Sequence, residues 1–67
     1  MKTIDTYYSD DKKRTAIVKQ DDAGVYAIDF YDYNIGELAL TRKVFEDKSL
    51  RYVEDAAENY VTGILNV

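Results

Sequence analysis

The stretch DAGVYAIDFYDYNIG, residues 22–36, decides the fold of this chain, because it reads as one strand between two turns. Residues 22–24 and 34–36 both place an Asp or Asn two positions before a glycine. In a three-residue hairpin loop the third position needs a positive φ, which glycine adopts without a Cβ clash. β-branched and aromatic residues favour a strand over residues 25–33. The stretch therefore predicts the middle of an antiparallel meander.

The flanking segments extend this meander on both sides. Residues 13–20 predict a strand before the first turn, and residues 38–45 predict a strand after the second, although Ala and Leu there also suit helices. The alternation in residues 3–8 favours a fourth, edge strand over a flexible arm for residues 1–12.

An amphipathic helix is predicted from Ser49 to about Leu65. Ser49 can cap it by accepting a hydrogen bond from a free backbone N–H. Gly63 is either the residue that ends the helix or a weak interior position. The apolar stripe with helical spacing consists of Leu50, Val53, Ala57, Tyr60, Val61 and Ile64. We expect one α+β domain over residues 1–67: a three- or four-stranded antiparallel meander sheet with one C-terminal helix packed on one face.

The two turns also predict the strand register. A loop at residues 22–24 places Val18 opposite Ile28, and a loop at residues 34–36 places Phe30 opposite Leu40. The apolar face against the helix then contains Ala16, Val18, Tyr26, Ile28, Phe30, Leu38, Leu40 and Val44. The opposite, solvated face contains Thr15, Ile17, Lys19, Ala27, Asp29, Tyr31, Tyr33, Ala39, Thr41 and Lys43. A slip of one residue would invert a strand's pattern.

Composition excludes several classes of protein. The chain has 13 acidic and 9 basic residues, a net charge of −4, and no Cys or His. Disulfides and thiolate or imidazole metal sites are therefore absent, and we expect no metal and no cofactor. A chain this short buries only about 60% of its unfolded surface, so a partner subunit could help to stabilise it. The negative charge argues against binding to anionic membranes and makes nucleic-acid binding less expected.

No apolar run approaches the length of a membrane span, and no apolar segment follows the first three residues as in a signal peptide. These features predict a cytoplasmic protein.

The sequence predicts that this chain is not an enzyme. Asp29 and Asp32, with nearby tyrosines, are the best acid–base candidates, but the open face predicted for Asp29 gives its pKa no reason to shift. Without His or Cys, no nucleophile and base come together. The acidic pairs at residues 10–11 and 21–22 lack the spacing of a calcium loop and fit turns instead.

Seven tyrosines point to a contact surface, because tyrosine offers a large amphipathic area that is enriched at protein interfaces. Tyr7, Tyr8, Tyr31 and Tyr33 are the residues predicted to be exposed and to bind a partner, whereas Tyr26 and Tyr60 suit the core. We therefore expect a small non-enzymatic binding or accessory protein that engages a protein partner or itself.

The alternative is a nucleic-acid-binding module that uses the open face of the sheet. Lys19, Arg42 and Lys43 would then hold phosphates, together with the basic run at residues 12–14, and Tyr31 would stack on bases. Asp29, in the middle of that face, counts against this alternative.

Two resemblances accompany these patterns. Three strands followed by a helix, over residues 13–65, resemble in architecture the AP2 and integrase amino-terminal DNA-binding domains. In those families the sheet carries Arg, Lys and Trp into the major groove, which here implies Lys19, Lys43 and Thr41, and Trp is absent. The segments EDKSL, residues 46–50, and EDAAENYV, residues 54–61, resemble small uncharacterised proteins of tailed phages of marine cyanobacteria. That likeness implies a phage accessory protein in the host cytoplasm, with no known activity.

Overall fold

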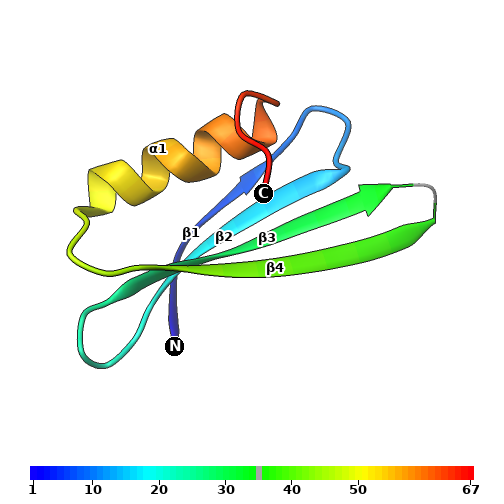
Figure 1. The fold of residues 1–67 in the computed structure, drawn as a ribbon. Helices are drawn as coiled ribbons and strands as arrows, with labels where there is room; N and C mark the ends of the chain where they lie inside the picture. The colour runs from blue at the N-terminus through cyan, green and yellow to red at the C-terminus, as the bar shows by residue number, and fades with distance from the viewer. Residues whose placement is uncertain (35) are drawn as a thin grey trace.

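A computed structural model of the chain describes residues 1–34 and 36–67 as one antiparallel sheet and one helix (Figure 1). Its elements are β1 (Lys2–Tyr8), β2 (Arg14–Gln20), β3 (Tyr26–Asn34), β4 (Glu37–Phe45) and α1 (Leu50–Val61). The strands lie in the order β1-β2-β3-β4. The predicted fold class is confirmed, and residues 2–8 form the fourth, edge strand.

The first turn sets the predicted register. Val18 lies opposite Ile28 in the pairing of β2 with β3. Asp21 Oδ1 accepts hydrogen bonds from the backbone N–H groups of Ala23 and Val25, both at 2.9 Å. Gly24 has the expected positive φ of 86°. The aspartate side chain thus satisfies the turn's backbone donors while glycine completes the bend.

The predicted register of the second turn is wrong by one residue. Asn34 pairs with Glu37, so Phe30 lies opposite Thr41 rather than Leu40. Gly36 has the expected positive φ of 77°, and Ile35, in the middle of the predicted turn, lies outside the described residues. Because side chains alternate along a strand, this shift moves every side chain of β4 to the other face.

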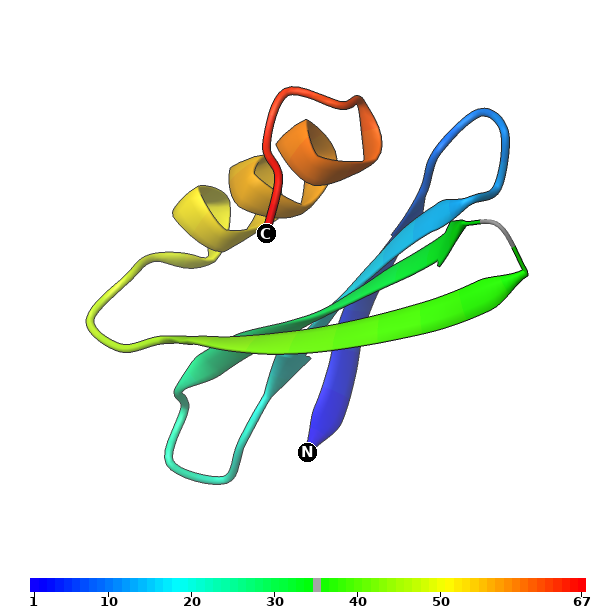
Figure 2. The same cartoon turned by 45° about the vertical axis from the view of Figure 1, so that its right-hand side comes forward.

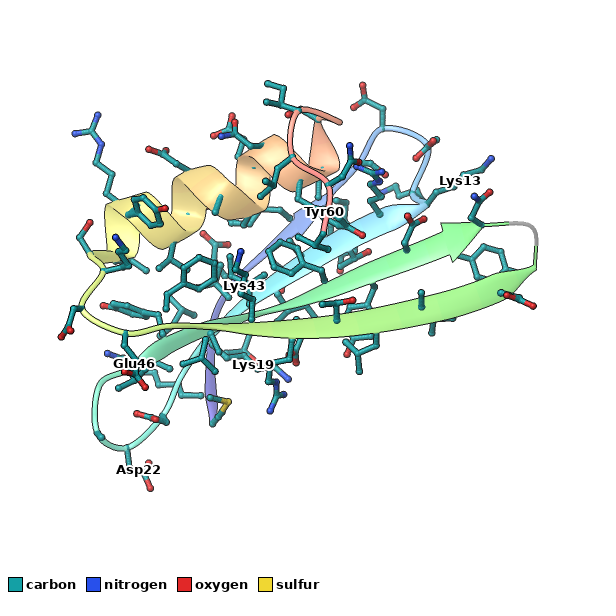
Figure 3. The ribbon with its side chains drawn as sticks, viewed as in Figure 1. Lys13, Lys19, Asp22, Lys43, Glu46 and Tyr60 are labelled. Carbon is teal, nitrogen blue, oxygen red and sulfur yellow. The ribbon has the colours of Figure 1, made fainter. Side chains whose placement is uncertain are left out.

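The shift changes which side of the sheet is apolar at β4. Leu38, Leu40 and Val44, predicted for the core, lie on the face away from the helix and are 63%, 57% and 54% exposed. Thr41 and Lys43, predicted for the open face together with Ala39, lie on the helix side. Figure 3 shows Lys43 on that side of β4, whereas Lys19 points away on the opposite side.

The core lies between the helix and the first three strands. Its buried members are Ala16, Val18, Ile28, Phe30, Val53, Ala57 and Tyr60. Phe30 meets the helix as predicted, with its ring centroid 4.7 Å from that of Tyr60 in an edge-to-face arrangement. Among the described residues, β4 adds only Phe45, at the margin of this core. The β3–β4 hairpin projects past the helix, which leaves most of β4 uncovered on both faces (Figures 1 and 2).

The helix begins as predicted and ends earlier. Ser49 caps it, its Oγ accepting from Tyr52 N at 3.2 Å. At the other end, Ile64 N donates to Asn59 O at 2.9 Å, and Gly63 adopts a φ of 86°. This pattern turns the chain away from the helical path. Ile64 is therefore 76% exposed instead of joining the buried stripe.

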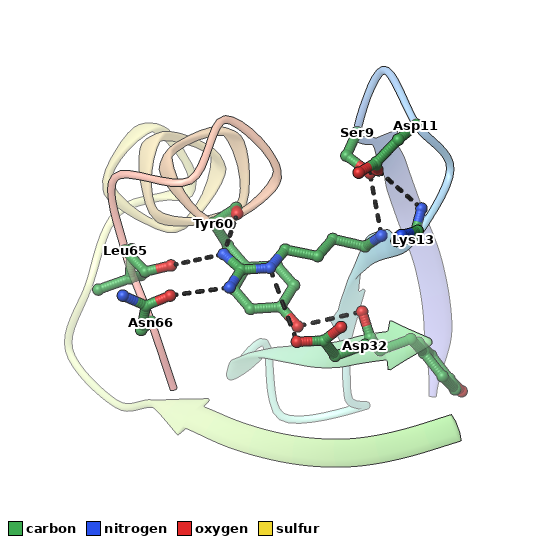
Figure 4. Close-up of polar contacts among 9 residues, drawn as sticks. Ser9, Asp11, Lys13, Asp32, Tyr60, Leu65 and Asn66 are labelled. Carbon is green, nitrogen blue, oxygen red and sulfur yellow. Dashed lines mark hydrogen bonds and ion pairs between the residues drawn. The ribbon is translucent and has the colours of Figure 1, made fainter. Parts of the chain in front are cut away.

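Arg14 binds the C-terminal segment to the sheet, through the contacts drawn to Tyr60, Leu65 and Asn66 in Figure 4. Its Nη1 donates to the carbonyl oxygen of Tyr60 at 3.1 Å, and its Nη2 donates to Asn66 Oδ1 at 2.8 Å. The guanidinium lies 4.8 Å from the centre of the Tyr60 ring and forms an ion pair with Asp32. One side chain thus joins β2, β3, the helix end and the last residues.

Tyr60→Phe tests a second contact that holds the helix end on the sheet. Tyr60 Oη donates to the carbonyl oxygen of Tyr31 in β3 at 3.1 Å. Removing that buried hydroxyl should lower the free energy of unfolding by about 1 kcal/mol. Tyr52→Phe is the control, since Tyr52 is 52% exposed. Urea denaturation followed by circular dichroism measures both variants. Equal losses in the two would show that the Tyr60 hydrogen bond contributes nothing.

Candidate interaction surface

The face of the sheet that points away from α1 is called the outer face here. Strand pairing and alternation place on it Thr6, Tyr8, Thr15, Ile17, Lys19, Ala27, Asp29, Tyr31, Tyr33, Leu38, Leu40, Arg42 and Val44. An antiparallel sheet with one covered face commonly shows polar side chains on the other. This outer face instead combines a charged centre with an apolar end.

Four side chains form the apolar end, and we call them the outer patch: Tyr31, Tyr33, Leu38 and Leu40. Tyr31 lies directly opposite Leu40, and Tyr33 lies opposite Leu38. Side chains paired in this way are in contact range across an antiparallel ladder. Leu38, Leu40 and Tyr33 are all more than half exposed. The outer patch is therefore a cluster of large apolar groups in water.

The charged centre of the outer face is built around Asp29. Lys19 Nζ and Arg42 Nη2 each lie 2.8 Å from Asp29 Oδ2. Asp29 is only 1% exposed, so the prediction that the open face leaves it in an ordinary solvated environment is wrong. The hydrogen bonds from Arg42, and then those from Lys19, lower its pKa to about 2 against the opposing effect of burial. Asp29 therefore stays ionised and paired near neutral pH.

The structure brings together three of the four tyrosines predicted to bind a partner. Tyr31 and Tyr33 belong to the outer patch, and Tyr8 is 59% exposed on the same face at the end of β1. Tyr7 points to the helix instead and donates to Glu54 Oε2 at 3.2 Å. Burial, followed by the hydrogen bond to Glu54, raises the pKa of Tyr7 to about 12. Tyr7 is thus part of the helix–sheet packing, contrary to its predicted exposure.

The basic residues predicted for nucleic acid do not form one surface. Lys19 and Arg42 both bind Asp29, and Lys43 lies on the other face of the sheet. From the basic run at residues 12–14, Arg14 is engaged with the C-terminal segment. Lys19 and Arg42 therefore share one carboxylate, which leaves that centre with one excess positive charge, and Lys43 and Arg14 lie apart from it.

A groove of about 580 Å³ lies beside the β1–β2 turn. Its lining residues are Tyr8, Ser9, Asp10, Asp11, Lys13, Arg14, Asp32, Asn34, Val61, Thr62 and Gly63. Asp11 Oδ1 accepts from Lys13 N at 3.0 Å and from Ser9 Oγ at 2.7 Å, and these hydrogen bonds lower the pKa of Asp11 (Figure 4). The groove's side chains thus hold the turn together, and the described residues contain no cluster of three metal-binding side chains.

The sequence did contain a signal for the observed register of β3 with β4. The observed register places Asp29 opposite Arg42, whereas the predicted register placed Asp29 opposite Thr41. An opposite-charge pair directly across two strands stabilises an antiparallel ladder and so favours this register. The hydrophobic pattern of residues 38, 40 and 44 instead favours the register that buries them, which is why the sequence predicted Tyr31 and Tyr33 for an exposed surface but not Leu38 and Leu40.

Comparison with known proteins identifies no relative: no protein-family model, curated protein or solved structure matches this chain. Within the part of the chain that the structure describes, no helix has the length and apolar character needed to cross a membrane.

Proposed function

We propose that this chain is a non-catalytic binding module that engages a protein, either another partner or a second copy of itself, through the outer patch. The exposure of Leu38, Leu40 and Tyr33 on one surface supports this proposal, because apolar clusters bordered by polar groups are typical of protein contact sites. Tyrosine is enriched at such interfaces. Covering the outer patch would remove from water the apolar side chains that the helix leaves exposed.

The chemistry of the acidic groups agrees with a non-catalytic role. A general base works best with a pKa near the operating pH. Asp29, the buried carboxylate, has a pKa lowered to about 2 by its two cations, so it is a weak base. The chain also has no His or Cys to supply another base or nucleophile.

The double variant Leu38→Ser/Leu40→Ser tests the role of the outer patch. We expect the wild-type chain either to exceed the mass of a monomer or to retain a specific protein from cells that naturally produce it. Either behaviour should be lost in the double variant and kept in Tyr52→Ser, the control, which removes a similarly exposed side chain from the helix. Light scattering after size exclusion and affinity capture measure these outcomes, and circular dichroism verifies the fold. Binding that survives the double variant would contradict the proposal.

Nucleic-acid binding is the competing outcome, and fluorescence anisotropy with mixed-sequence DNA and RNA tests it. We expect no binding at about 100 μM protein and low salt, because non-specific binders show a Kd of about 10⁻⁴–10⁻⁶ M even at physiological salt. Asp29→Asn sharpens the test, since it releases Lys19 and Arg42 from their carboxylate. Salt-sensitive binding by the wild-type chain that Asp29→Asn strengthens would favour the nucleic-acid alternative.

A further inference from the structure

The two free edges of the sheet differ in their protection. In β1 the register shifts between Thr3 and Asp5, and Asp5 Oδ1 accepts a hydrogen bond from Thr6 N at 2.9 Å. An irregularity of this kind, with a charged side chain beside it, blocks the addition of another strand. In contrast, β4 pairs with β3 through all nine residues from Glu37 to Phe45 without a shift. The edge of β4 is therefore long and regular and lacks such an irregularity, although Glu37, Arg42 and Lys43 carry charge along it.

The direction of the backbone groups at this edge follows from the hydrogen-bond pattern. Tyr33 N donates to Lys13 O at 2.7 Å, so the odd-numbered residues of β3 bond to β2. Hydrogen bonds alternate in antiparallel ladders, so the even-numbered residues of β3 bond to β4 and pair there with odd-numbered residues. The even-numbered residues of β4 consequently direct their N–H and C=O groups to the free edge. They are Leu38, Leu40, Arg42 and Val44.

The sequence of β4 is complementary to itself when it is read antiparallel about Leu40. Leu40 then lies opposite Leu40, and Glu37 lies opposite Lys43 at both ends of the pairing. Glu37 and Lys43 are exposed and have no ion pair among the described residues. Opposite charges directly across a ladder stabilise it, and like charges destabilise it.

Other registers lack this complementarity. Pairing centred on Thr41 would place Glu37 opposite Phe45 and Lys43 opposite Ala39, which forms no charge pair. Pairing centred on Arg42 would set two arginines against each other. Among the registers that use the free backbone groups of β4, the one centred on Leu40 therefore matches the charges best.

We propose that two copies of this chain associate by antiparallel pairing of their β4 strands, with Leu40 opposite Leu40 and Glu37 opposite Lys43. This inference rests on the proposed function and names its partner as a second copy. The strands would form one continuous eight-stranded sheet with a twofold axis perpendicular to it. Both helices lie on the same side of that sheet. The two outer patches meet at Leu40 on the other side, where each covers part of its neighbour.

Charge exchange tests the register. Glu37→Lys and Lys43→Glu each set like charges opposite one another twice in the dimer, whereas the double variant Glu37→Lys/Lys43→Glu restores opposite charges. We expect each single variant to raise the dimer Kd by about tenfold or more, and the double variant to return it close to the wild-type value. Sedimentation velocity over protein concentrations up to about 1 mM measures the Kd, with circular dichroism to verify folding. Single and double variants that weaken the dimer equally would overturn the register.

Single cysteines give an independent test, because the chain has none. Leu40→Cys should form a disulfide-linked dimer under mild oxidation, since only at the twofold axis does a residue face its own copy. Leu38→Cys is the control: its two copies would lie four residues apart along the ladder, about 13 Å. Equal cross-linking of the two variants would overturn the proposal.

The outcomes also separate this inference from the proposed function. A dimer that Leu38→Ser/Leu40→Ser abolishes but charge exchange leaves unchanged would overturn β4 pairing and retain self-association through the outer patch. A wild-type chain that stays monomeric would overturn the dimer. The proposed function would then depend on capture of a different protein that the same double variant loses.

Discussion

Ile28→Ala is expected to lower the free energy of unfolding by about 2–5 kcal/mol, a large fraction of the total stability of a chain this small. Ile28 is fully buried between the helix and the sheet, so truncation removes apolar contacts and leaves a cavity. Chemical denaturation followed by circular dichroism at low protein concentration measures the loss.

Leu40→Ala is the matched comparison for Ile28→Ala. It removes the same number of carbon atoms from the neighbouring strand, but Leu40 is 57% exposed on the outer face. Its effect on the monomer should be within about 0.5 kcal/mol, as for most surface substitutions. If Leu40→Ala cost as much as Ile28→Ala, the observed register of β4 would be wrong and the register predicted from the second turn would be correct.

Asp29→Asn is expected to remove about 2 kcal/mol of stability near neutral pH. The pKa of Asp29 is about 2 in the folded chain, against 3.8 for an ordinary Asp, because Arg42 and Lys19 favour its charged form. A lowered pKa contributes stability that is fully present above pH 3.8 and is lost as the pH falls toward about 2. The difference between wild-type and variant should therefore shrink over that interval.

Urea denaturation at several pH values between 6 and about 2 measures this difference. Asp55→Asn is the control, since Asp55 is an exposed helix residue without an ion pair among the described residues. A constant difference between wild-type and Asp29→Asn over the whole range would show that the charge of Asp29 does not stabilise the fold. In that event the loss would come from packing alone.

Local chemistry in the sequence determined most of the fold. The first turn carries its own aspartate acceptor and glycine, which set the pairing of β2 with β3 without help from distant residues. Ser49 likewise marks the helix start, because a cap acts on backbone groups within one turn. The four-stranded meander, the single helix and the contact between Phe30 and the helix follow from these signals.

The tertiary structure decided the faces of β4. A one-residue change in pairing inverts a strand, and two registers competed: one buries Leu40 opposite Phe30, and the other places Arg42 opposite Asp29. The helix packs mainly on β1, β2 and β3 and meets β4 at Phe45, whose ring lies beside Tyr52, so burying Leu40 there would have gained little. Pairing Arg42 with the buried Asp29 instead gave this carboxylate a second cation beside Lys19. That long-range choice adds Leu38 and Leu40 to the exposed Tyr31 and Tyr33, although the hydrophobic pattern of β4 alone assigns both leucines to the core.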